Sequence, residues 1–376
     1  MKREFGLKTV TSFILLTILI FAEVLMVAFN FIIQIKLLKE EEKRTVESSI
    51  KTINVFIDSA KIYYHQMASL VTHLPEIQEA VSKKDRNFLI DRFLPAFNYL
   101  KENFGITQFH FHIPPTVSFL RLHDIENFGD DISRDRKTVV QVEKTRKGLR
   151  GIEVDRDGLG VRGVEPIFYR GNYVGSVEFG GGLKKEIEQI KKAIDAEVGL
   201  VLYKDLLSGW SGLKDLKYNF GEWVSLYFTA NEPNMFISEA SLRKASQSED
   251  KYYVEKLSKL GKEYNVVYSP FKDFSGKTIG FIYFVKESII SPVKIFKILG
   301  INIMFCIIIL IVTFLLAKFM MNKYLINPLV RIVRITEEIS MGKVSQKLEV
   351  KNAVEEIAIL GKSIERIRIT MKRLLD

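Results

Sequence analysis

Three histidines and an arginine lie near one another in the chain, at spacings that an extended backbone would place on one face. In the stretch Phe-His-Phe-His-Ile, which contains His110 and His112, aromatic rings alternate with imidazoles. Successive side chains of a strand point to opposite faces, so the two histidines share one face. A second alternating stretch contains Arg121 and His123. If the apolar faces pack on a helix, all four polar side chains gather on the other face of one sheet.

A cluster of imidazoles and cations in a partly closed pocket favours an anion, because arginine can hold a carboxylate through two parallel hydrogen bonds. Arg162 on a later predicted strand could join this cluster. Either Arg134 or Arg136, from the predicted helix between the strands, could join it as well. The predicted ligand is a small anionic metabolite. The predicted ligand-binding residues are His110, His112, Arg121, His123, Arg136 and Arg162.

Two alternatives remain open for this cluster. The basic groups could pair internally, since buried polar groups are normally hydrogen-bonded; the acidic candidates are Asp130, Asp131, Glu153 and Glu165. The spacing of His110, His112 and His123 also suits a zinc or nickel ion, although the sequence offers no obvious fourth ligand. We therefore predict neither a bound metal nor another cofactor, and we assign no catalytic residue.

Two apolar blocks, residues 10–35 and residues 295–321, each exceed the roughly 20 residues that a helix needs to cross a bilayer. The first block is too long for the core of a cleaved signal peptide. Glu23 lies near its centre and predicts a packing contact between helices in a dimer. The single cysteine, Cys306, lies in the second block, so no disulfide can form within the chain.

The net charge of +10 does not indicate nucleic-acid binding, because many basic residues flank the two apolar blocks and no nucleic-acid-binding motif accompanies them. Lysines and arginines precede the first block and follow the second, which predicts a cytoplasmic location for both termini by the positive-inside rule. Residues of about 36–294 would then lie outside the cytoplasm, and the chain would be a multi-pass protein of the inner membrane. The basic residues that support this orientation are Lys2, Arg3, Lys8, Lys318, Lys323, Arg331 and Arg334.

The middle of the chain predicts an α+β fold made of two PAS-like units. Apolar residues at spacings of three and four predict a stalk helix over residues 36–74. A further helix at residues 88–104, two strands, an inserted helix at residues 131–147 and three more strands complete a distal unit over residues 75–182. A helix and at least four strands predict a second, proximal unit over residues 183–292, which we interpret as a copy of the first.

Four motifs of the distal unit carry a family resemblance. They are Phe-His-Phe-His-Ile-Pro at 109–114, Ser-Phe-Leu-Arg-Leu-His at 118–123, Phe-Gly-Asp-Asp at 128–131 and Gly-Leu-Gly-Val-Arg-Gly-Val-Glu-Pro-Ile-Phe at 158–168. The segment resembles the double Cache domain, the extracytoplasmic input of many bacterial chemoreceptors and sensor kinases. The resemblance is strong over residues 106–180 and weak over residues 183–290. It implies a membrane receptor but fixes no ligand.

The C-terminal segment, residues 323–376, predicts two short helices joined by an extended connector. The second helix has apolar residues at spacings of 3, 4, 3, 4 and 3, typical of a coiled-coil seam. The segment resembles the HAMP domain, which relays signals as a parallel four-helix bundle of two chains; the matching residues are Pro328, Gly342, Glu355 and Glu356. A passive dimerisation coil is the alternative.

These features together predict a transmembrane receptor of the chemotaxis or two-component type, with residues 1–9 in the cytoplasm. We expect a homodimer through the stalk, transmembrane and HAMP helices, and a separate cytoplasmic kinase or chemotaxis partner for output. No catalytic motif for nucleophilic, metal-dependent or phosphate-binding chemistry occurs in the sequence, so we predict that the chain is not an enzyme. A membrane-anchored enzyme, a metal-binding protein and a structural scaffold are the alternatives.

Overall fold

The computed structural model describes residues 7–259, 261–351 and 353–375. The chain divides into two compact units. Glu40–Ser291 forms one of them, which we call the α/β unit. Met1–Lys39 and Pro292–Asp376 form the other, which we call the helical unit.

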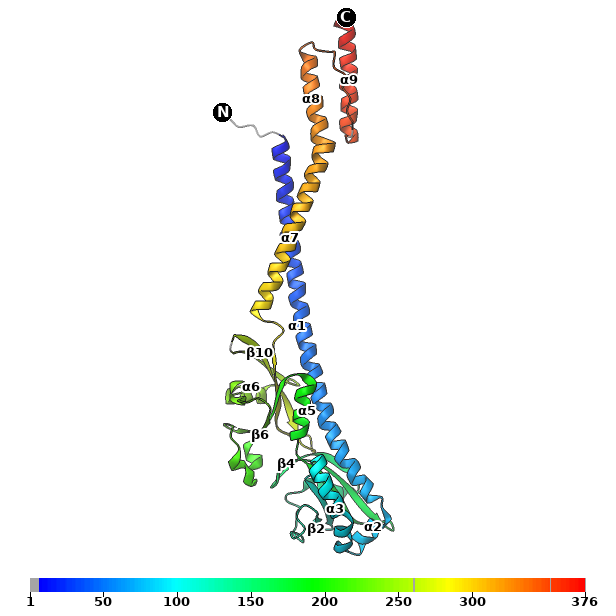
Figure 1. Cartoon of the computed structure of the whole chain (residues 1–376), viewed down its shortest axis with the longest axis vertical. Coiled ribbons are helices and arrows are strands. Elements are labelled where there is room, and N and C mark those ends of the chain that lie inside the picture. The colour runs from blue at the N-terminus through cyan, green and yellow to red at the C-terminus, as the bar shows by residue number, and fades with distance from the viewer. Residues whose placement is uncertain (1–6, 260, 352, 376) are drawn as a thin grey trace. The chain divides into compact units, whose positions relative to one another are not determined.

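Helix α1 (Leu7–Thr72) is the longest element of the chain and contributes its C-terminal part to the α/β unit (Figure 1). The predicted apolar stripe of this helix is buried in the core, at Val46, Ile53, Ile57, Ala60, Tyr64, Ala68 and Val71. The helix ends at Thr72, two residues before the predicted end. Pro75 does more than terminate it, because this proline occupies the first turn of a new helix, α2 (Pro75–Ser82), where its missing N–H costs nothing.

Helix α3 (Arg86–Phe104) follows α2 and matches the predicted helix to within two residues at its start. The Asp85 carboxylate caps it by accepting a 3.1 Å hydrogen bond from the Phe88 N–H. Gly105 terminates it in the left-handed region, at a φ of 74° that favours glycine.

The distal sheet has five antiparallel strands: β1 (Gln108–Ile113), β2 (Val117–Arg121), β3 (Leu149–Asp155), β4 (Gly158–Tyr169) and β5 (Asn172–Gly181). Their order across the sheet is β2-β1-β5-β4-β3, so the first and last strands pair at its centre. The predicted alternation on β1 is confirmed, because Phe109 and Phe111 face the core that contains α1 and α3. The Phe109 ring packs on that of Phe179 with a centroid distance of 4.0 Å.

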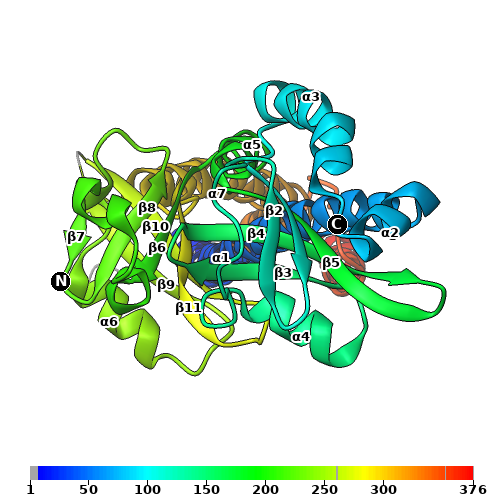
Figure 2. The ribbon, with the colours of Figure 1, turned by 90° about the horizontal axis from the view of Figure 1, so that it is seen from below.

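Two predicted boundaries in the distal unit are wrong. Strand β2 ends at Arg121, so His123 lies in the turn that follows rather than on the strand. The inserted helix, α4 (Lys137–Thr145), is shorter than the predicted span 131–147. Figure 2 shows α4 and α3 to opposite sides of the distal strands, so the sheet is covered on both faces.

The proximal sheet repeats the distal topology. Its strands are β6 (Glu197–Tyr203), β7 (Asn219–Phe220), β8 (Trp223–Phe228), β9 (Tyr253–Lys259), β10 (Lys262–Lys272) and β11 (Thr278–Glu287). Their order is β7-β8-β6-β11-β10-β9. Without the two-residue β7, this is again the second, first, fifth, fourth and third strand in sequence. The interpretation as two copies of one unit therefore agrees with the topology.

Short helical segments complete the proximal unit. They are α5 (Lys184–Ile194), α6 (Glu239–Gln247) and the 3₁₀ segments η1 (Lys204–Leu207), η2 (Ser211–Asp215) and η3 (Pro233–Met235). Helix α5 packs with α1 in the main core, whereas α6 covers the other sheet face through Leu242 and Ala245. The sequence reading missed α6, β7 and β9.

The turn between β10 and β11 joins the two sheets. The Phe274 N–H donates a 2.8 Å hydrogen bond to the Ile152 carbonyl of β3, the edge strand of the distal sheet. Gly151 allows this approach, because a Cβ at that position would lie 2.4 Å from the Phe274 Cβ. The bond satisfies part of an edge that would otherwise be open for pairing with another chain.

Among the described residues, two helices are long and apolar enough to cross a membrane: the one that contains Leu16–Thr72 and the one that spans Pro292–Ser340. The second comprises α7 (Pro292–Met321), a π-helical turn η4 (Asn322–Ile326) and α8 (Asn327–Ser340). An amide pair, Gln34 and Asn302, links α1 and α7 with a 3.3 Å hydrogen bond.

Helix α9 (Glu355–Leu375) runs parallel to α8, and the connector passes back between their ends (Figure 1). The Val354 N–H bonds the Tyr324 carbonyl near the start of α8, and Arg368 bonds the Val344 carbonyl beyond its end. A small apolar core fills the space between the helices, with Ile332, Ile335, Ile339, Leu348 and Ile357 buried in it.

Candidate functional site

The distal sheet carries polar side chains on the face opposite α1, and its register brings them together. His110 of β1 lies opposite Arg121 of β2 on one side and Glu178 of β5 on the other, and His112 lies opposite Ser176. Directly paired residues of antiparallel strands project from the same face. We call this surface the distal polar face.

Strands β4 and β3 extend the distal polar face. Arg162 of β4 lies opposite Gly151, and alternation along β3 places Glu153 and Asp155 on the same side. A Cβ at Gly160 would lie 2.3 Å from the Arg162 guanidinium carbon. Glycine at that position therefore lets the guanidinium lie flat on the sheet.

The start of α4 closes over this face. The Glu153 carboxylate accepts hydrogen bonds from the Thr138 N–H at 3.0 Å and from its hydroxyl at 2.7 Å. These bonds satisfy a donor in the first turn of the helix, where a negative charge is also favoured. Burial nevertheless raises the pKa of Glu153 to about 6, since it outweighs the two hydrogen bonds.

Arg136, the residue before α4, joins Arg162 in a buried network of ion pairs. Arg136 donates to Asp155 at 2.6 Å and to Asp157 at 2.8 Å, and Arg162 donates to Asp155 at 3.1 Å. Both guanidinium groups also lie 3.4 Å from one oxygen of Glu178. The side chains of Asp155 and Glu178 are fully buried, so these carboxylates depend on the arginines for their stability.

Arg121 lies at the rim of the face and has a partner of its own. It holds Asp130 through two hydrogen bonds of 2.7 and 2.8 Å, the two-pronged arrangement that favours a carboxylate. These bonds hold the pKa of Asp130 well below its usual value. The Asp130 side chain is 38% exposed, so this pair, unlike the inner one, is open to water.

All six predicted ligand-binding residues lie in this region. His110, His112, Arg136 and Arg162 lie in the buried part of the face, and Arg121 lies at its rim. His123 approaches from the turn after β2, with its ring centroid 6.0 Å from that of His110. The internal pairing left open by the sequence is present for Arg121 and Asp130.

Two of the acidic partners considered from the sequence lie elsewhere. Glu165 points to the other face and bonds His65 of α1 at 2.7 Å, and Asp131 accepts a hydrogen bond from the Ser133 N–H. The sequence reading missed Asp155, Asp157 and Glu178. The alternation that placed Glu153 would also have placed Asp155, two residues further along β3.

The charges of the site do not leave a surplus of cations. Arg121, Arg136, Arg162 and Arg156, which bonds Asp130 at 3.1 Å, give four positive charges, whereas Asp130, Asp155, Asp157 and Glu178 give four negative ones. The histidines add no charge at neutral pH, because burial and the nearby cationic groups lower the pKa values of His110 and His112 well below the usual value.

The two buried histidines are oriented by serine hydroxyls. His110 Nε2 lies 2.8 Å from the Ser118 hydroxyl, and His112 Nδ1 lies 3.1 Å from the Ser176 hydroxyl. Each serine fixes the orientation of one imidazole through one ring nitrogen and makes no bond to the other ring nitrogen of that histidine. His110, His112 and Glu178 each offer a potential metal-ligand atom, and these atoms lie within 4.8 Å of one another.

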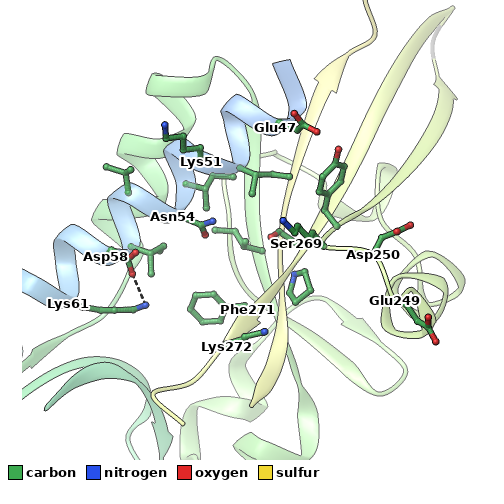
Figure 3. Close-up of a pocket in the computed structure, with 18 residues that line it drawn as sticks. Glu47, Lys51, Asn54, Asp58, Lys61, Glu249, Asp250, Ser269, Phe271 and Lys272 are labelled. Carbon is green, nitrogen blue, oxygen red and sulfur yellow. Dashed lines mark hydrogen bonds and ion pairs between the residues drawn. The ribbon is translucent and has the colours of Figure 1, made fainter. Parts of the chain in front are cut away.

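A separate, wider cleft lies between α1 and strand β10 in the proximal part of the α/β unit (Figure 3). Its volume is about 970 Å³. Lys51, Asn54 and Asp58 of α1 line it together with Phe271 and Lys272 of β10. None of the residues predicted to bind ligand lines this cleft.

Comparison with known families gives a match over most of the chain. Residues 39–289 match the family dCache_3, described as the double sensory domain of two-component sensor kinases. A comparison with curated proteins found no match.

Solved structures resemble the chain at low identity. The sensory domain of the Campylobacter jejuni chemoreceptor Tlp3 (CcmL) is 11% identical, with a TM-score of 0.41 over 70% of this chain and 96% of that one. The sensor domain of the Vibrio cholerae histidine kinase DctB is 11% identical, with a TM-score of 0.40 over 68% and 98%. The periplasmic domain of Vibrio cholerae LuxQ is 11% identical, with a TM-score of 0.37 over 65% and 99%. No inference about a ligand follows from likeness at this level.

Proposed function

Because the chain belongs to the family of double sensory domains of two-component sensor kinases, we propose that it is a transmembrane receptor for a small extracytoplasmic ligand. The distal polar face receives the ligand, and the second apolar helix carries the signal to α8 and α9. The observation that carries this proposal is a buried, charged face inside a sensory domain that is flanked along the chain by two long apolar helices.

The proposed topology has two membrane spans, at residues 10–35 and 295–321, with both termini in the cytoplasm. The stalk then covers residues 36–74, the distal unit residues 75–182, the proximal unit residues 183–292 and the relay residues 323–376. The exposed apolar side chains of α1 and α7 in the helical unit support lipid contact. Membrane-impermeant thiol reagents test this topology in a Cys306→Ser background. Glu126→Cys should react in whole cells and Ile364→Cys should not; the reverse pattern would refute the orientation.

The ligand class depends on which arginine is free to act. Asp155 and Glu178 are fully buried and offset Arg136 and Arg162, so a small anion would have to displace two dry ion pairs there. At the rim, an anion would replace the water-exposed Asp130 on Arg121, and the displaced Asp130 would keep its 3.1 Å bond to the half-exposed Arg156. We therefore assign the anionic group of the ligand to Arg121.

Thermal unfolding of the full chain in lipid nanodiscs, with a panel of small organic acids, tests this assignment. An acid that binds should raise the midpoint of unfolding, and Arg121→Ala should abolish the rise. The exposed Arg92 of α3 provides the matched control, since Arg92→Ala should leave the rise unchanged. A rise that persists in the Arg121 variant would refute the assignment.

The relay is proposed to work as a HAMP bundle in a homodimer. Pro328 lies in the first turn of α8, and Gly342 follows the end of that helix with a φ of 79°. Glu356 lies in the first turn of α9, where a negative charge stabilises the helix. Leu360, Ile367 and Leu374 on α9 are exposed within one chain. A second copy of α8 and α9 would cover them and complete a four-helix bundle.

Output would come from a separate cytoplasmic kinase or chemotaxis partner, and we propose no enzymatic activity for this chain. Disulfide cross-linking between two copies of Ile367→Cys, in the Cys306→Ser background, reports the packing of the bundle. A ligand that raises the unfolding midpoint should also change the cross-linking rate. Binding without any change in that rate would contradict the relay.

A further inference from the structure

The distal polar face contains buried polar atoms that the ion-pair network does not explain. Within the described part of the chain, His110 Nδ1, His112 Nε2, His123 Nδ1 and one oxygen of Glu178 (Oε2) are shielded from solvent and have no hydrogen-bond partner. Each such atom destabilises the folded state if it stays unpaired, because it has lost its hydrogen bonds to water. Four of them at one place indicate a missing partner for the group.

The unpaired nitrogens are the ones that an ion would use. Ser118 and Ser176 occupy one ring nitrogen of each histidine, and the other nitrogen is free. Histidines that bind metals characteristically use one nitrogen for the ion and the other for an outer hydrogen bond, which fixes the ring. The two serines supply these outer bonds.

Glu178 divides its two oxygens in the same way. Its Oε1 lies 3.4 Å from both Arg136 and Arg162, whereas Oε2 has no hydrogen-bond partner and lies 3.7 Å from His112 Nε2. Two ligands about 2.0 Å from a tetrahedral zinc ion would lie about 3.3 Å apart. This pair therefore needs an adjustment of a few tenths of an ångström, and all three ligand atoms, which lie within 4.8 Å of one another, would move closer together around the ion.

We propose that His110 Nδ1, His112 Nε2 and Glu178 Oε2 form a binding site for a divalent transition-metal ion, with zinc as the ion that fits the ligands. Two imidazoles and one carboxylate leave a fourth position on the metal. His123 is the neighbouring imidazole, and it or a ligand atom fills that position. The Glu178 carboxylate lies next to the two imidazoles, and its negative charge favours a cation at this place.

This inference goes beyond the proposed receptor function, since it concerns the ion and not the relay. It also adds a member to the ligand set that the sequence suggested for a metal, because a glutamate from β5 joins His110 and His112. The sequence could not supply this partner, since 66 residues separate Glu178 from His112.

The experiment uses the full chain in nanodiscs, purified without a histidine tag and stripped with a chelator. Titration with zinc at pH 7 should show one equivalent bound per chain, and Co²⁺ should give the visible absorption of a four-coordinate site. His110→Ala and His112→Ala should each weaken zinc binding by more than about 100-fold, beyond the 10–100-fold effect typical of outer hydrogen-bond partners. The exposed His73 at the end of α1 is the control, and His73→Ala should bind as the wild type does.

Ser176→Ala keeps every ligand atom and should weaken zinc binding by about 10–100-fold, so the test survives if a histidine variant fails to fold. Absence of zinc and Co²⁺ binding by the wild-type chain would overturn the proposal, as would equal losses in the His73 variant. If an organic acid still raised the unfolding midpoint in that case, the receptor proposal would stand without the metal. Zinc binding with no change in the cross-linking of α9 by any ligand would instead support the metal site and refute the relay.

Discussion

Replacing Arg136 by methionine should destabilise the α/β unit more than any change at an exposed ion pair. The Arg136 side chain is 5% exposed, and two of its three acidic partners, Asp155 and Glu178, are fully buried. Methionine keeps much of the volume and removes the charge. Arg162 then faces two buried carboxylates alone.

The expected loss follows from the burial of the charges. Removing one partner of a buried pair typically costs about 3–5 kcal/mol, because the other charge stays desolvated. For a unit of this size, each kcal/mol lowers the unfolding midpoint by roughly 2–4 °C, which gives a drop of about 6–20 °C. Thermal unfolding of the full chain in nanodiscs, followed by near-ultraviolet circular dichroism, measures it.

Arg243 provides the matched control. It bonds Glu222 and Glu239 on the surface of the proximal unit, with all three side chains about half exposed. Exposed pairs contribute about 0–1 kcal/mol, so Arg243→Met should lower the midpoint by no more than about 4 °C. Equal shifts for the two variants would refute the reasoning, because they would mean that water reaches the Arg136 network in solution.

A double variant separates the pair from its surroundings. Asp155→Asn alone should also destabilise the unit, since it leaves Arg136 with fewer buried partners. Arg136→Met combined with Asp155→Asn should cost less than the sum of the two single changes, because neither charge of the pair is then left alone. Strict additivity would show that the two residues do not interact.

Two further predictions concern pH and packing. The pKa of Glu153 is raised above its unfolded value, so the folded state binds the proton more tightly. The free energy of unfolding should therefore fall by about 2 kcal/mol as pH rises from 4.5 through 6. Glu153→Gln should remove this dependence in unfolding curves measured across that range. Gly163→Ala should lower the unfolding midpoint by about 2–12 °C, because the new Cβ would lie 2.2 Å from the backbone nitrogen of His65 and 2.3 Å from the Tyr64 carbonyl carbon on α1. Gly209→Ala is the control and should leave the midpoint unchanged, since a Cβ there meets nothing within 4 Å.

The sequence predicted the elements that have strong apolar periodicity. The stripe of α1 and the alternation on β1 depend only on spacing, and spacing survives folding unchanged. Strand β9 was missed because it is an edge strand with the sequence Tyr-Val-Glu-Lys-Leu-Ser-Lys, in which only Val254 and Leu257 are aliphatic, so its pattern resembles a loop. Helix α6 is short and mostly polar, which hides it in the same way.

The site was predictable in its composition but not in its charge balance. Alternation was enough to gather His110, His112 and Arg121, because these residues lie on two strands that are adjacent in sequence. Glu178 pairs with His110 only because β5 inserts beside β1, and that register is set by the whole sheet. The ligand charge was therefore inferred from the cations alone, since the acids that offset them come from β3 and β5.

The hydrogen bond from Phe274 to Ile152 connects the distal polar face to the last strand of the α/β unit. Strand β3, which receives the bond, carries Glu153 and Asp155 on its polar side. The turn that donates it continues into β11, and only residues 288–291 separate β11 from α7. A β-strand is already near full extension and cannot lengthen under load. A displacement of β3 by a fraction of an ångström would therefore move β11 along its own axis without stretching it. The proximal sheet would then transmit the displacement even if its own cleft never held a ligand.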